Sequence, residues 1–225
     1  MCGRSAQRSP SRKIAEKFKV EEVPPLAERY NVAPAQEVLV IRETAGVDEA
    51  AFFKWGLVPR WAKDPAIGNK LINARSETIT EKPSFREAFA RRRCLIQADG
   101  FYEWQRAEGR KQPYFFKMRD GSPFGFAGLW ERWEGDGDEV INSCTILTTE
   151  ANDVLRPVHD RMPVILRPED HELWLEAEVG KSDLVKELLR PYPSAETLGH
   201  PVGALVNSPR NQGVELTEPA AVNSV

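Results

Sequence analysis

Cysteine, histidine and long apolar runs are scarce in this sequence of 225 residues. The three cysteines, Cys2, Cys94 and Cys144, form no C-x-x-C pair, which argues against a disulfide framework and against a structural zinc site. We therefore expect reduced thiols, no metal and no cofactor. The longest apolar runs, such as 38–41 and 164–166, are far too short to cross a bilayer, so no membrane partner is expected.

An excess of basic residues and an apolar leader are also missing. The net charge of −3 argues against broad electrostatic wrapping of duplex DNA, although it permits a local basic groove. The charged segment at the start of the sequence has no apolar stretch of the kind found in signal peptides, which predicts a cytoplasmic protein. We expect this protein to be a monomer.

What the sequence does contain is a series of short strand patterns separated by turns. Apolar or alternating runs predict strands over 37–43, 50–54, 94–99, 101–105, 114–118, 124–133, 140–148 and 164–166, and the first two should pair as a hairpin. A last strand should end near Asn207. Helix signals predict helices over 10–19, after a cap at Ser84, over 151–155, from Pro168 and from Ser182.

These elements predict an α+β fold. We expect one strand-rich domain over residues 1–219, built from curved antiparallel sheets or an open barrel with flanking helices, and a short tail at 220–225. No repeat and no linker divides the sequence into two domains.

The second residue, Cys2, offers unusual chemistry. Its small side chain lets an aminopeptidase remove Met1, which leaves a cysteine with a free α-amine. Near neutral pH, an α-amine with a pKa of about 8 and a thiol with a pKa of about 8.5 are both partly deprotonated. The amine and the thiol can therefore close a five-membered ring on one aldehyde carbon, which an internal cysteine cannot do.

Six ordered motifs carry a family resemblance: Met1-Cys2-Gly3-Arg4, 30–34 (YNVAP), 55–61 (WGLVPRW), 73–77 (NARSE), 98–104 (ADGFYEW) and 159–163 (HDRMP). Together they closely resemble the SRAP family, the SOS-response-associated peptidase proteins that crosslink to abasic sites in DNA. The resemblance runs from Met1 to about Pro219. It implies an α+β fold with a curved sheet or barrel, single-stranded DNA as partner, and covalent capture of abasic sites through Cys2.

By this resemblance, four residues carry the chemistry. Cys2 forms a Schiff base and then a thiazolidine with the open aldehyde, Glu103 is the general base, and Asn73 holds the nucleophile and the sugar. His159 lies in a loop between two prolines, where it can face a cleft and assist opening of the sugar ring. Lyase-type Schiff base chemistry and autopeptidase activity are both compatible with this set. The crosslink would shield the lesion during replication and the DNA damage response.

Five further residues are expected to contact DNA, and the three arginines among them match family positions that hold phosphates. Arg4, Arg75 and Arg161 would hold phosphates, for which a planar guanidinium is suited. Pro34 and Trp61 would stack against bases beside the lesion. We interpret Trp55 and Trp104 as core residues, and we expect the protein to be associated with the nucleoid when it is bound to DNA.

Three alternatives remain open from the sequence. A cysteine peptidase would use Cys2 as nucleophile with His159 as base. A glutamine amidotransferase of the N-terminal nucleophile class also begins Met-Cys-Gly, but the Arg-Gly-Pro-Asp and Asn-Gly-Glu stretches of that class are missing. A non-covalent single-stranded DNA-binding module would leave Cys2 without a role.

Overall fold

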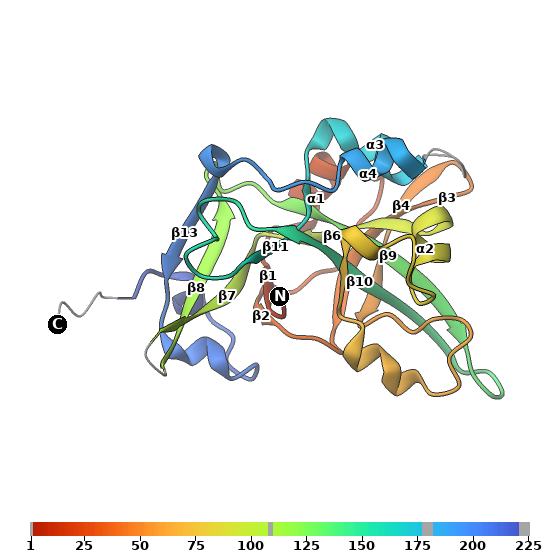
Figure 1. Ribbon diagram of the computed structural model, residues 1–225, viewed down its shortest axis with the longest axis horizontal. Helices are drawn as coiled ribbons and strands as arrows, with labels where there is room; N and C mark the ends of the chain where they lie inside the picture. The colour runs from red at the N-terminus through yellow and green to blue at the C-terminus, as the bar shows by residue number, and fades with distance from the viewer. Residues whose placement is uncertain (1, 108–109, 177–181, 221–225) are drawn as a thin grey trace.

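Two β-sheets organise the chain in the computed structural model, which describes residues 2–107, 110–176 and 182–220 (Figure 1). The larger sheet has the order β11 (Arg161–Pro163), β10 (Val140–Glu150), β4 (Val47–Trp55), β3 (Glu37–Thr44), β6 (Arg93–Ala98), β9 (Phe124–Glu134) and β12 (Ile165–Leu166), with β5 (Asn73–Arg75) beside β10. Because β9 also pairs with β10, five strands of this sheet close into a barrel. The predicted α+β, strand-rich fold is confirmed.

The hairpin β3–β4 shows how the sequence pattern builds the barrel wall. Its two strands are joined by a turn at Ala45 and Gly46, both with positive φ (54° and 82°), which suits the twist of a tight hairpin. Along β3, Val38 and Val40 pack into one buried cluster, whereas Leu39 and Ile41 pack into another. Both faces of the strand are therefore covered, which explains its nearly continuous apolar run.

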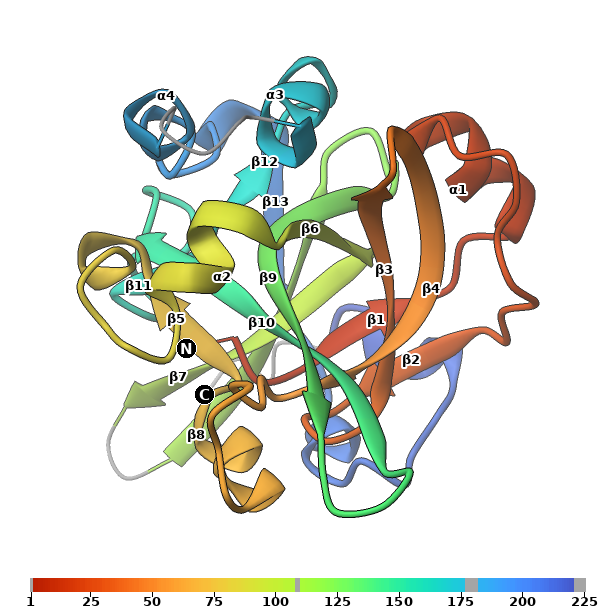
Figure 2. The ribbon, with the colours of Figure 1, turned by 90° about the vertical axis from the view of Figure 1, so that its right-hand side faces the viewer.

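The smaller sheet has the order β13 (Thr197–Pro201), β8 (Arg110–Met118), β7 (Gly100–Ala107), β1 (Ser5–Gln7) and β2 (Arg29–Val32). The three-residue strand β1 lies between β7 and β2, with Ser5 opposite Phe101 on one side and opposite Val32 on the other. Every residue of β1 is buried. The start of the chain is therefore an interior strand of the fold (Figure 2).

Asp99, between β6 and β7, fixes the exit of β1. Its carboxylate accepts hydrogen bonds from the backbone N–H groups of Arg8 (2.7 Å) and Ser9 (3.0 Å), from the Ser9 hydroxyl, and from the Gln97 amide (3.0 Å). Asp99 is only 6% exposed, so these bonds replace solvent for buried donors. The register of β1 is thereby held from its C-terminal end.

Short helices cover the barrel. They are α1 (Ser11–Phe18), α2 (Arg86–Arg91), α3 (His171–Glu176) and α4 (Ser182–Glu187), with 3₁₀ turns at Pro65–Lys70, Ser76–Thr78, Pro168–Asp170, Ser194–Glu196, Ala204–Asn207 and Val214–Thr217. In α1, Ile14 and Phe18 are buried, one turn apart on the face toward the barrel. Within the described residues, no helix is long and apolar enough to span a membrane.

Three details of the predicted elements are wrong. Helix α2 starts at Arg86 after Phe85 and has no side-chain cap, so the Ser84 capping signal is not used. Residues 151–155 form turns, because the Asn152 side chain accepts from the N–H groups of Val154 and Leu155 and competes with a helix. The last strand ends at Pro201, and the segment before Asn207 is a 3₁₀ turn.

Residue 220, the first of the predicted tail, is still hydrogen-bonded to the last strand. The Ala220 N–H donates to the Pro201 carbonyl at 2.9 Å, and Pro219 forms a bridge with Val202. The rest of the tail, 221–225, lies outside the described residues. The boundary at 219 stays a prediction.

Replacing Asp99 with alanine should destabilise the fold strongly, because it leaves the partly buried N–H of Arg8 and the buried N–H of Ser9 without an acceptor. We expect the free energy of unfolding to fall by about 3 kcal/mol in chemical denaturation. Asp120 is the matched control, since it also accepts from a backbone N–H, that of Ser122, but is exposed. D120A should cost about 0.5 kcal/mol. Equal losses for both variants would contradict the assigned role of Asp99.

His171 should make stability depend on pH. It is buried and stacked on Phe18, with ring centroids 5.4 Å apart, and burial lowers its pKa from 6.5 to about 4. As the pH falls, the unfolded state is protonated first, so stability is fully present above about pH 6.5 and declines toward pH 4. Between pH 7 and pH 5 the loss should be about 2 kcal/mol. In denaturant titrations at pH 7 and pH 5, H171Q should not show this loss of stability. If its stability depended on pH as that of wild type does, the role of His171 would be refuted.

Candidate functional site

Cys2 lies at the entry of β1, inside the protein. The Tyr102 N–H donates to the Arg4 carbonyl at 2.9 Å, which continues the β1–β7 pairing toward the start of the chain. The Cys2 side chain is 0% exposed, and its Sγ lies 3.9 Å from the Arg4 carbonyl oxygen. Burial and the negative charge of Glu103 raise the pKa of the Cys2 thiol well above its usual value. The thiol is therefore kept protonated near neutral pH.

Asn73 reaches Cys2 from a different part of the chain. It begins β5, which runs parallel to β10 with Asn73 opposite Ile146. Its Nδ2 donates to the Cys2 carbonyl oxygen at 2.7 Å, and its buried Oδ1 has no hydrogen-bond partner among the described residues. This contact fixes the Cys2 backbone and leaves the acceptor of the same amide available.

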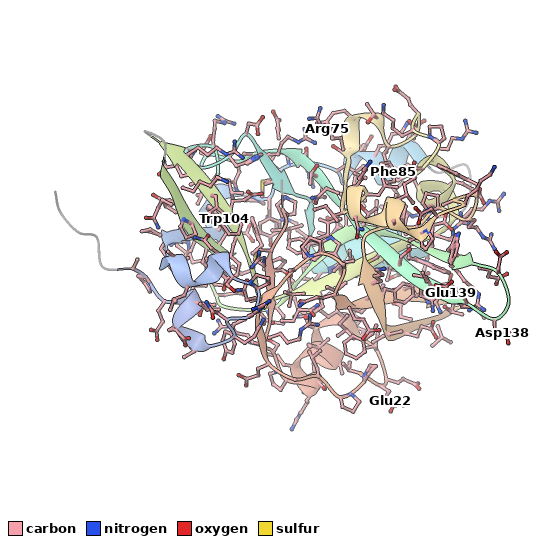
Figure 3. The ribbon with its side chains drawn as sticks, turned by 90° about the horizontal axis from the view of Figure 1, so that it is seen from below. Glu22, Arg75, Phe85, Trp104, Asp138 and Glu139 are labelled. Carbon is pink, nitrogen blue, oxygen red and sulfur yellow. The ribbon has the colours of Figure 1, made fainter. Side chains whose placement is uncertain are left out.

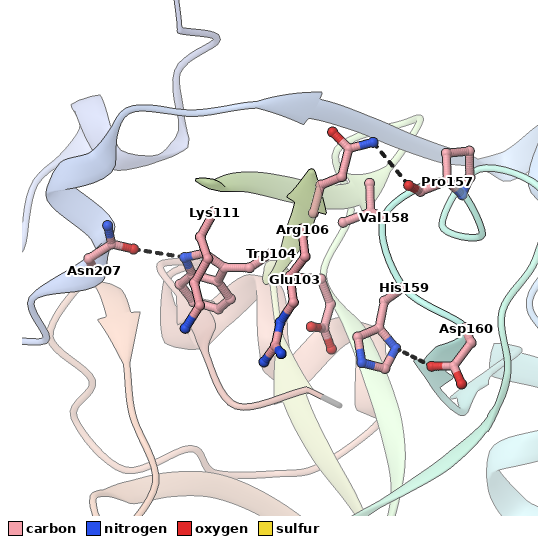
Figure 4. A pocket seen from close by; sticks show the side chains of 10 residues that line it. Glu103, Trp104, Arg106, Lys111, Pro157, Val158, His159, Asp160 and Asn207 are labelled. Atoms are coloured by element: carbon pink, nitrogen blue, oxygen red, sulfur yellow. Dashed lines mark hydrogen bonds and ion pairs between the residues drawn. The ribbon is translucent and has the colours of Figure 1, made fainter. Parts of the chain in front are cut away.

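Glu103 and His159 line one pocket of about 970 Å³ (Figure 4). Glu103 stands on β7, opposite Tyr114 of β8, and is only 3% exposed. Its charge acts on the Cys2 thiol, so it links the buried nucleophile to the pocket. The predicted residues Cys2, Asn73, Glu103 and His159 are thus brought together from four separate segments.

The His159 ring is held through Nδ1. The Arg161 N–H donates to Nδ1 at 2.9 Å, and the Asp160 carboxylate lies 2.9 Å from the same nitrogen. In the neutral ring, acceptance of the Arg161 N–H places the proton on Nε2, whereas a protonated ring can donate from Nδ1 to Asp160. These two partners fix the orientation of the imidazole ring in the pocket.

The predicted phosphate ligand Arg4 makes its bonds inside the protein. Its Nη1 donates to Asn31 Oδ1 (2.7 Å) and to the Val206 carbonyl (2.9 Å), and its guanidinium lies 5.9 Å from the Trp104 ring centre. Asn31 Nδ2 in turn donates to the carbonyls of residues 206, 208 and 211. Arg4 therefore joins the N-terminal strand to the C-terminal segment.

Arg161 and Arg75 differ in how they are placed. Arg161 forms a two-pronged ion pair with Glu77 and donates to the Thr148 carbonyl at 2.6 Å. The nearby guanidinium lowers the pKa of the Glu77 carboxyl. Arg75 on β5 is exposed, and within the described ranges no hydrogen bond or ion pair of its side chain is found (Figure 3). Of the two, Arg75 presents its charge to solvent.

The two predicted base-stacking residues are accessible to different degrees. The Trp61 side chain is 58% exposed, which is exceptional for an aromatic residue in this chain, and Pro34 is half-buried before the turn at Ala35. Neither lines the pocket that holds Glu103 and His159. In the part of the chain that the structure describes, no group of three or more His, Cys, Asp or Glu residues could hold a metal ion.

Trp104 is half-buried and packs against the edge of one core cluster, so the prediction that it is a core residue is correct only in part. Its ring lines the pocket and its Nε1 donates to Asn207 Oδ1 at 2.7 Å, whereas Trp55 is fully buried as expected. Alternation along β7 places Glu103 and Trp104 on opposite faces of the strand, yet both line the pocket, which extends around the strand. The sequence pattern could not reveal this. Asp160, Arg106 and Lys111 also line the pocket and were not predicted.

A model of the family "SOS response associated peptidase (SRAP)" matches residues 1–209. The chain belongs to the SRAP family. Among its relatives, the abasic site processing protein YoqW of Bacillus subtilis is 42% identical over 222 residues, which cover 97% of this chain and 99% of YoqW. The abasic site processing protein YedK of Escherichia coli is 34% identical over 230 residues, and this alignment covers 97% of the SRAP chain and 100% of YedK. A crystal structure of a protein from Bacteroides thetaiotaomicron superposes with a TM-score of 0.88 at 28% identity, covering 98% and 100% of the two chains.

Proposed function

We propose that this SRAP protein captures abasic sites in single-stranded DNA by forming a covalent crosslink through Cys2 after Met1 has been removed. The observation that carries the proposal is the convergence of Asn73 and Glu103 on Cys2, next to a pocket that also holds His159. The function for which the relatives are named, abasic site processing, supports the same substrate.

The chemistry proceeds in steps that balance. His159 transfers a proton at the ring oxygen of the deoxyribose, which opens the hemiacetal to an aldehyde. The α-amine of Cys2 adds to the aldehyde carbon, Glu103 relays the protons, and loss of water gives a Schiff base. The thiol then adds to the same carbon, and the S–H proton passes to the nitrogen. The product is a thiazolidine, in which carbon is bonded to both nitrogen and sulfur.

The electrostatics of the site favour this order of steps. Because burial and Glu103 keep the Cys2 thiol protonated, the amine is the first nucleophile and sulfur follows only when its proton has an acceptor. Ring closure also removes the Schiff base, which is the species that can eliminate the 3′ phosphate. Strand cleavage by a lyase reaction is therefore a side path that the thiol suppresses.

The same electrostatics disfavour the peptidase alternative for external substrates. A cysteine peptidase needs a thiolate, and the Cys2 site raises the pKa of the thiol. Self-removal of a short leader before Cys2 would not need such a thiolate at rest. We infer that the protein acts as a monomer in the cytoplasm and joins the nucleoid when it is bound to DNA.

Substitution of Cys2 separates the two nucleophiles. C2A keeps a free α-amine after removal of Met1, so it should form a Schiff base that borohydride traps, but no heat-stable adduct without a reductant. Wild-type protein should give a heat-stable adduct with a single-stranded abasic oligonucleotide, and intact mass should show that Met1 is absent from it. The proposal would be refuted if C2A gave as much heat-stable adduct as wild type, or if Met1 were retained in the wild-type adduct.

The arginines should respond differently to substitution. R75Q should leave the free energy of unfolding within about 0.5 kcal/mol of wild type, because Arg75 is exposed, and reduce the salt slope of single-strand binding by about 0.7. R161Q should lower the free energy of unfolding by about 2 kcal/mol, because it removes bonds to Glu77 and Thr148. Denaturant titration and binding at several salt concentrations give both quantities. Equal effects of the two variants on stability would contradict this distinction.

A further inference from the structure

The pocket beside Glu103 and His159 is larger than the proposed chemistry requires. Its volume of about 970 Å³ lies at the upper end of the range for pockets that hold a whole drug-sized ligand. One deoxyribose with its phosphate is smaller than such a ligand. The remaining space is lined by Trp104, Arg106, Lys111 and Asn207, none of which has a role in the steps above.

Two cations mark this part of the pocket. Arg106 on β7 and Lys111 on β8 are directly opposite each other in the hairpin, and both are exposed. Like charges opposite each other on neighbouring strands destabilise a sheet, so the fold does not account for the pair. Within residues 2–107, 110–176 and 182–220 neither has an ion pair, whereas Arg42, Arg132 and Arg167 each contact a glutamate.

The pocket therefore has a cationic side and an acidic side. In Figure 4, Lys111 and Arg106 lie on one side, and Glu103, His159 and Asp160 lie on the other. Phosphate is repelled by the two carboxylates and attracted by the two cations. A bound strand with its sugar carbon at Glu103 would thus have its neighbouring phosphates near Arg106 and Lys111.

We propose that Arg106 and Lys111 form a subsite for the phosphates of nucleotides that flank the abasic site on one side. This inference rests on the proposed function and adds to it the path of the DNA strand beyond the reacting sugar. Arg75, which lies well apart from Trp104 in Figure 3, is not part of this subsite. The strand would then cross the site from one basic contact to the other.

The test compares R106Q/K111Q with the control R12Q/K13Q, which removes two exposed cations from α1, away from the hairpin end in Figures 1 and 2. Equilibrium binding is measured with single strands that carry a tetrahydrofuran analogue of the abasic site, which lacks the aldehyde and cannot crosslink. The analogue is placed internally, at the 5′ end or at the 3′ end.

At 0.05 M salt, R106Q/K111Q should bind the internal probe at least about eightfold more weakly, and its salt slope should be shallower by about 0.7 for each phosphate that the protein no longer neutralises. The weaker binding should persist with one of the end-placed probes and disappear with the other, while R12Q/K13Q binds every probe as wild type does. Wild-type binding by R106Q/K111Q, or equally weakened binding of both end-placed probes, would overturn the subsite.

Crosslinking distinguishes a failure of this subsite from a failure of the proposed function. Wild-type protein is incubated with a true internal abasic site. If no adduct forms, the proposed function fails whatever the binding data show. If the adduct forms and R106Q/K111Q binds like wild type, only the subsite is refuted.

Discussion

The insertion of β1 between β7 and β2 is the constraint on which the site depends. A strand of three buried residues, bonded on both sides and held at its exit by Asp99, fixes the position of the residues just before it. Since the backbone at Arg4 still pairs with Tyr102, Cys2 has little freedom to lie anywhere other than beside β7. Glu103 acts on Cys2 because it is the next residue of the same strand.

Burial decides the chemistry as much as the identity of the residues does. An exposed terminal cysteine would carry amine and thiol of similar reactivity, and any aldehyde in the cell could occupy it. In this fold the thiol is enclosed, its pKa is raised and its carbonyl is bound by Asn73. The proposed order, with nitrogen first and sulfur second, follows from the environment that the two sheets create around one residue.

The local hydrophobic pattern predicted most strands and helices, but it could not predict contacts between segments that are far apart in the sequence. Alternation predicted the β3–β4 hairpin and the run from β6 to β10. The family motifs pointed to Cys2, Asn73, Glu103 and His159, which the structure brings together, and their roles stay predictions. Closure of the barrel depends on β10 pairing with both β9 and β4, which no local signal reveals. The engagement of Arg161 by Glu77 and of Trp104 by Asn207 joins residues 84 and 103 positions apart, so sequence reasoning could not assign these side chains.

The bonds from Arg4 and Asn31 to the carbonyls of residues 206, 208 and 211 tie the first strand to the last segment of the described chain. During synthesis, the amino end leaves the ribosome long before those carbonyls exist. The proposed removal of Met1 by an aminopeptidase would therefore act on a nascent chain, and the pocket wall that includes Asn207 forms only near the end of translation. On the proposed function, Cys2 would thus become a free terminus before it is enclosed, so the folded protein would not have to open for Met1 to be removed.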